Sequence, residues 1–201
     1  MSPQLFSNKI FLSGIIFFTI LGGYALYQSS IPTGECKEYF AHHEYKKARQ
    51  TCTRQPEKND FLASIILGTL YLEGHAGERN YEKAEKLFLQ AAQSPDKKAS
   101  VLGEYELGLV YGRKDYAHFN LGKSASWFKK AADHGHKQSQ FMYGNLLTLG
   151  RGVDKNTDTA TYYLNKALDQ GIEKAKITLN YIQETTGVPL PTKNITKKTV
   201  K

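Results

Sequence analysis

The chain has 201 residues, 40% of them apolar and 23% charged, which is typical of a folded protein and excludes a wholly disordered one. Its formal net charge is +8, but half of that charge comes from four lysines of the carboxyl-terminal tail, Lys193, Lys197, Lys198 and Lys201. Elsewhere basic and acidic residues alternate, so the chain lacks the basic stripe of nucleic-acid-binding proteins. We therefore expect no nucleic-acid partner.

The amino-terminal segment carries the strongest localisation signal. Residues 10–27 form an uncharged, apolar run, close to the ~20 residues with which a helix crosses a bilayer. Lys9 precedes the run and acidic residues follow it from Glu35, so the amino-terminal flank should stay in the cytoplasm. We expect residues 1–28 to form a cytoplasmic stub and an inner-membrane anchor in contact with the lipid bilayer. Residues 29–35 would be a linker, and the rest of the chain would lie in the periplasm.

Two alternatives to an anchor stay open. Gly23-Tyr24-Ala25 offers the small-residue spacing of a signal-peptide cleavage site, and cleavage would leave a secreted or periplasmic domain. A buried core helix would also be apolar, but the position of the run ahead of a Ser- and Gly-containing linker disfavours it. An anchor and a signal peptide both place the following residues outside the cytoplasm.

The two cysteines, Cys36 and Cys52, follow the apolar run. On the predicted topology they lie in an oxidising compartment, where disulfides persist. A helical turn near residues 42–44 would set them opposite one another in an antiparallel hairpin, so residues 36–58 are predicted to form a disulfide-stapled cap. The alternatives are two free buried thiols or a zinc site, and zinc is disfavoured because the chain has no CxxC or HxxxH pair.

The remainder of the chain is an internal repeat. A Leu-Gly or Tyr-Gly pair recurs with a period of 36 to 40 residues, and each pair is followed 17 residues later by a small residue and seven residues after that by an alanine. The pairs are Leu67-Gly68, Leu107-Gly108 and Tyr143-Gly144, and the small residues are Ala84, Ser124 and Ala160, then Ala91, Ala131 and Ala167. Such a period is typical of a stacked array, whose units bury their apolar faces against their neighbours.

Each unit is predicted to form two helices. In the first unit the pattern predicts helices over residues 62–72 and 81–93, with a glycine loop between them. Asn80, Asn120 and Asn156 recur at the starts of the second helices, where they should act as N-caps. The middle unit has four extra residues before Leu107, which should lengthen its first helix by about a turn.

The array has predicted ends as well. Tyr45 to Ala48 repeats the pattern of Tyr81 to Ala84, so the capping hairpin looks like a shortened opening repeat. Residues 175–183 supply a closing helix, which completes a repeat domain over residues 60–185. The basic tail, residues 186–201, is predicted to be disordered.

Several of these motifs resemble those of the Sel-one-like repeat family, relatives of the tetratricopeptide repeats. The match covers roughly residues 60–182 and includes the Leu-Gly pairs, Gly150-Arg151-Gly152-Val153 and Lys130-Ala131-Ala132. The resemblance implies an all-α fold: a short α-solenoid of stacked helix-turn-helix repeats, here preceded by one transmembrane or signal helix. It also implies a protein that binds other proteins.

The first helix of each unit is expected to line the inner surface of the array, as in related helical repeats. Its positions there are unusually apolar, and exposed apolar and aromatic side chains commonly mark a protein-binding surface. The candidate partner-binding residues are Ile65, Thr69, Tyr105, Leu109, Phe141 and Asn145. The alternative is that this stripe packs between neighbouring helices.

Catalysis has little support in the sequence. The six histidines mostly fall in loops, and no nucleophile with a base and an orienting group is apparent. We expect a non-enzymatic protein without cofactor or metal. Two functions fit: a scaffold that binds an envelope protein on its concave face, or an immunity protein that neutralises a toxic effector, such as a type VI secretion phospholipase, in the periplasm.

Overall fold

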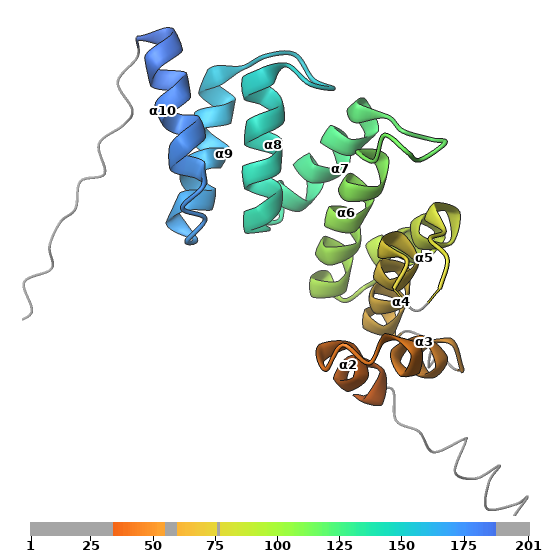
Figure 1. Ribbon diagram of the computed structural model, residues 1–201. Helices are drawn as coiled ribbons and strands as arrows, with labels where there is room; N and C mark the ends of the chain where they lie inside the picture. The colour runs from red at the N-terminus through yellow and green to blue at the C-terminus, as the bar shows by residue number, and fades with distance from the viewer. Residues whose placement is uncertain (1–33, 55–59, 76, 188–201) are drawn as a thin grey trace, which may run out of the picture.

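The computed structural model describes residues 34–54, 60–75 and 77–187, which form helices and loops without strands (Figure 1). In chain order the helices are α2 (Gly34–Ala41), α3 (Tyr45–Arg54), α4 (Phe61–Glu73), α5 (Tyr81–Ala92), α6 (Lys97–Tyr111), α7 (Leu121–Asp133), α8 (Lys137–Leu149), α9 (Thr157–Asp169) and α10 (Ala175–Thr186). The predicted anchor, most of the linker and the tail from residue 188 lie outside the described residues. Of the helices that are described, none is long and apolar enough to cross a membrane.

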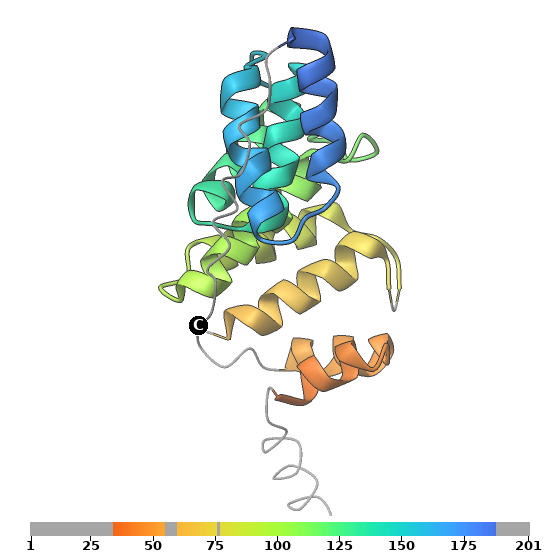
Figure 2. The same ribbon diagram turned by 90° about the vertical axis from the view of Figure 1, so that its left-hand side faces the viewer.

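The helices follow one another along an arc, each packed on its neighbours in sequence (Figure 1). At the carboxyl-terminal end α8, α9 and α10 stand side by side (Figure 2). Among the described helices, α2 also packs on α4, α4 on α6 and α8 on α10, while no comparable contact joins α6 to α8, α5 to α7 or α7 to α9. The first helices of the units are therefore on the inner side of the arc. An all-α solenoid is what the repeat pattern predicts.

Asparagine caps fix where the second helices begin. The side-chain oxygens of Asn80, Asn120 and Asn156 accept hydrogen bonds from backbone N–H groups three residues ahead, at 2.8, 2.9 and 2.9 Å. The predicted caps are confirmed. The backbone N–H of each asparagine also donates to a carbonyl near the end of the preceding helix, at 2.9 to 3.0 Å. Each cap thus joins the two helices of its hairpin.

The repeated glycines make room for large side chains of the second helices. A Cβ added at Gly68 would lie 2.5 Å from the ring of Phe88, and one added at Gly108 would lie 2.6 Å from the ring of Phe128. Gly144 has the same relation to Leu164, at 2.7 Å. These side chains pack into the space that each missing Cβ leaves.

Gly108→Ala should therefore destabilise the array by about 1 kcal/mol. Overpacking costs about 1–3 kcal/mol, and the better helix propensity of alanine offsets about 1 kcal/mol of that. Chemical denaturation of the variant checks the sign. In a Phe128→Ala background the same substitution should cost less, because the clash is gone; an equal cost in both backgrounds would show that the ring is not the cause.

The first helix of the middle unit is longer than its counterparts, as predicted. Relative to Gly108, α6 begins about one turn earlier than α4 and α8 begin relative to Gly68 and Gly144. The four extra residues of this unit thus extend α6 at its amino-terminal end.

The opening hairpin is closed by a disulfide between Cys36 and Cys52, as expected, with the two Cα atoms 5.3 Å apart. Both cysteines are buried and pack with Ala63 and Leu67 of α4. His43 takes a positive φ of 61° in the turn between α2 and α3. The bridge therefore closes the cap and also forms part of its contact with the array.

Candidate partner-binding surface

The six predicted contact residues lie on the first helices, two on each of α4, α6 and α8. On α4, Ile65 is only 8% exposed and belongs to the core of the first repeats. The Thr69 hydroxyl donates to the Ile65 carbonyl oxygen at 3.0 Å. Ile65 is therefore a core residue rather than an accessible contact, whereas Thr69 is half-buried and uses its hydroxyl donor within α4.

On α6, Tyr105 is half-buried. Its ring lies 4.6 Å from that of His136 and 6.0 Å from that of Phe128, measured between centroids. Burial raises the pKa of Tyr105. Leu109 packs against the core of the carboxyl-terminal repeats. Tyr105 therefore reaches across the seam between the second and third repeats.

On α8, Phe141 is half-buried against the same core. The Asn145 side-chain oxygen accepts a hydrogen bond from the Thr178 hydroxyl of α10 at 2.7 Å. The structure thus places the predicted residues at one register of the first helices, and two of them, Tyr105 and Asn145, contact the next repeat. Packing between helices was the alternative that the sequence left open, and it accounts for much of this stripe.

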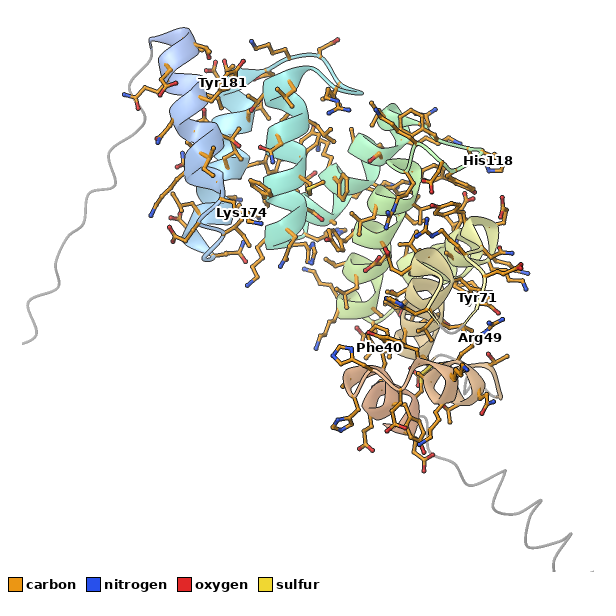
Figure 3. All side chains as sticks on the ribbon, in the orientation of Figure 1. Phe40, Arg49, Tyr71, His118, Lys174 and Tyr181 are labelled. Carbon is orange, nitrogen blue, oxygen red and sulfur yellow. A yellow bond between two sulfur atoms is a disulfide. The ribbon has the colours of Figure 1, made fainter. Side chains whose placement is uncertain are left out.

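Two inner-face residues were not among the predicted ones. Ile177 and Tyr181 lie on α10, one period of 36 residues beyond Phe141 and Asn145. They are 73% and 46% exposed, and Tyr181 is labelled on the carboxyl-terminal helix in Figure 3. Extending the inner-face register onto the closing helix would have found them. They are the accessible apolar continuation of the stripe.

A carboxyl group with an unusual environment lies on α6. Burial, and then the nearby charge of Glu73, raise the pKa of Glu106 to about 7. Glu73 itself is paired with Arg113, whereas Glu106 has no hydrogen-bond or ion-pair partner among the described residues. At neutral pH this carboxyl group is therefore partly protonated.

Other polar clusters join structural elements. The Glu85 carboxylate of α5 accepts hydrogen bonds from Tyr111 and Tyr116. Burial, and then the hydrogen bond to Glu85, raise the pKa of Tyr111 to about 12. The cluster holds the loop after α6 against α5. No group of histidine, cysteine, aspartate or glutamate side chains in the described ranges could hold a metal ion.

The repeats that the geometry shows coincide with those of a known family. The Sel1 repeat profile matches residues 62–96, 101–136 and 137–172, which is more than half of the chain. The chain belongs to the Sel1 repeat family. The three matched segments correspond to α4–α5, α6–α7 and α8–α9, so α10 stands beyond the third Sel1 repeat.

Solved Sel1 structures share this fold. A Sel1 repeat protein from Oxalobacter formigenes is 24% identical with a TM-score of 0.67, over 79% of this chain and 64% of that one. A protective antigen of uropathogenic Escherichia coli strains, with an SLR fold, is 21% identical with a TM-score of 0.68, over 80% of this chain and 35% of the antigen. A putative Sel1 repeat protein from Klebsiella pneumoniae is 20% identical with a TM-score of 0.51, over 75% and 76% of the two chains.

This chain thus spans less than two thirds of the Oxalobacter protein and about a third of the antigen. Sel1 repeats are generally scaffolds for protein–protein interaction and are typically non-enzymatic. Membership of the Sel1 repeat family therefore makes a protein-binding surface the functional site to look for.

Proposed function

We propose that this chain is a non-enzymatic scaffold of the bacterial cell envelope, which holds a protein partner on the inner face of its Sel1 repeats. The observation that carries the proposal is the exposure of Ile177 and Tyr181 in the inner-face register of α10. Apolar and aromatic side chains of this kind are typical anchors of protein interfaces.

The packed part of the stripe supports this role in a second way. Tyr105 and Asn145 hold one repeat against the next, so the inner face is a pre-formed support that leads to the exposed pair on α10. A pre-organised surface loses little conformational entropy when it binds.

The envelope location rests on the sequence. The apolar run of residues 10–27 and the flanking Lys9 favour an exported repeat domain, anchored in the inner membrane or released by cleavage. The Cys36–Cys52 bridge is consistent with an oxidising compartment.

Photo-crosslinking in cells tests the proposal. A benzoylphenylalanine at Tyr181 of the full-length chain should give an adduct with a specific protein, recovered from the membrane fraction. Ile177→Asp should reduce the yield of that adduct about tenfold, because burying an isoleucine contributes about 1.5–3 kcal/mol. The variant should keep its thermal stability, since Ile177 is exposed in the free protein.

Tyr162 of α9 is the matched control, because it is an equally accessible aromatic residue, 53% exposed, on a second helix. The same photoreactive group at Tyr162 should give no such adduct. Equal labelling at both positions, or none at Tyr181, would rule out the inner face of α10 as a binding surface. A partner identified as a toxic effector would instead favour the immunity function.

A further inference from the structure

The extra turn of α6 builds a pocket. The Sel1 profile leaves residues 97–100 unmatched between its first and second repeats, and these residues form the turn by which α6 exceeds α4 and α8. A pocket of about 500 Å³ lies beside this turn, lined by Lys97, Lys98, Val101 and Leu102 of α6 and by residues 134–136 of the turn between α7 and α8. The pocket is open to solvent and its walls are mainly apolar.

The extra turn is held in place by three local features. The Asp96 carboxylate caps the helix by accepting from the backbone N–H of Ala99 at 2.9 Å. The Ser100 hydroxyl donates to the carbonyl oxygen of Ala92 at the end of α5, at 2.9 Å. Gly103 brings the α6 backbone so close to α5 that a Cβ there would lie 2.5 Å from the Ala92 nitrogen. The pocket wall is therefore a fixed part of the fold.

The other wall is fixed as well. His136 packs against the ring of Tyr105 and its Nδ1 lies 2.9 Å from the Ser139 hydroxyl oxygen. His134 lies 2.8 Å from the Glu104 carboxylate, measured from Nδ1 to Oε2. Tyr105 thus supports the pocket from behind.

The rim of the pocket carries positive charge from two lysines. Lys97 and Lys98 are exposed, and neither forms an ion pair with another described residue. Lys137 follows the turn. Burial lowers the pKa of His136, and the positive charge of Lys137 lowers it further.

The carboxylates close in sequence to the pocket residues each have a hydrogen-bond partner. Asp96 caps α6 and Glu104 bonds to His134. Asp133 accepts from Lys129 at 2.6 Å and from the Tyr163 hydroxyl at 2.5 Å. The two lysines at the mouth of the pocket therefore remain available to an acidic ligand.

We propose that this pocket receives one apolar side chain of a partner protein, from a segment that carries aspartate or glutamate beside that side chain. The apolar residue would contact Val101 and Leu102, and the neighbouring carboxylates would pair with Lys97 and Lys98. The inference rests on the proposed scaffold function and assigns the chemistry of part of the partner. An acidic, apolar peptide fits both the walls and the rim.

Peptide binding to the full-length chain in detergent tests the inference. The probe is a fluorescent Asp-Asp-Leu-Phe-Asp-Asp peptide, with two controls in which lysines replace the aspartates or alanines replace Leu-Phe. We expect saturable binding of the first peptide alone. The double variant Lys97→Glu/Lys98→Glu should weaken it at least about tenfold, which corresponds to about 1.4 kcal/mol, and Val101→Ser should weaken it as well.

Lys86→Glu/Lys114→Glu is the matched control, since it changes the net charge equally at two exposed lysines outside the pocket. Equal loss in both double variants, equal binding of the lysine peptide, or no saturable binding would overturn the inference. So would lysine-dependent binding to phosphatidylglycerol vesicles without peptide binding, which would indicate a lipid site. The Tyr181 adduct separates the two proposals: if it forms while the pocket variants have no effect, the scaffold stands and the pocket assignment fails.

Discussion

Removing the disulfide with Cys36→Ala/Cys52→Ala should destabilise the opening hairpin by about 3 kcal/mol, the value expected for a closed loop of this length. The effect should be local, because units of a stacked array contact only their neighbours. We expect hydrogen exchange in α2 and α3 to become fast while α6 to α9 keep their protection. Mass-spectrometric hydrogen exchange on the full-length protein measures both regions at once.

Reduction of the wild-type protein supplies the control. Both cysteines are at most 3% exposed, so a reductant should act slowly and then give the same exchange pattern as the double variant. Unchanged protection of α2 and α3 after either treatment would show that packing on Ala63 and Leu67 alone maintains the cap.

Glu106→Gln should stabilise the protein at pH 8 by on the order of 2 kcal/mol and have little effect at pH 4.5. The pKa of this carboxyl group is raised from 4.5 to about 7 in the folded chain. Between those values the folded state retains a proton that the unfolded state has lost, so stability falls as the pH rises from about 4.5 to about 7. Glutamine stays neutral and removes that loss.

Thermal unfolding at the two pH values, compared between variant and wild type, isolates this contribution from all other titrating groups. Glu82→Gln, at an exposed position of α5, is the control and should shift the transition little at either pH. The assignment fails if Glu106→Gln changes stability by the same amount at pH 4.5 and at pH 8.

Local signals in the sequence were enough to predict much of the fold. A cap such as Asn120 depends on residues three positions ahead, and the repeated Gly108 depends on a partner of its own repeat, so both recur visibly in the pattern. The disulfide could be predicted because the two cysteines fall on opposite sides of one turn. The extra turn of α6 followed from counting residues.

The accessible surface was harder to predict, because exposure depends on contacts between repeats. Ile65 and Phe141 occupy equivalent inner positions, yet one is buried and the other half-buried. Ile177 occupies the same register and is exposed, since no described helix follows α10. The pocket combines α6 with a turn more than thirty residues away, and no periodicity indicates that contact.

The seams between repeats have a mechanical consequence. The Tyr105–His136 contact and the Asn145–Thr178 hydrogen bond set the angle at which successive hairpins meet, and small changes of angle add along a solenoid. The distance from the pocket at Lys97 to Tyr181 therefore depends on both of these contacts between repeats. A ligand that engages both places at once must match the bend of the array, so stiffening or loosening either contact would tune selectivity without altering any atom that the ligand touches.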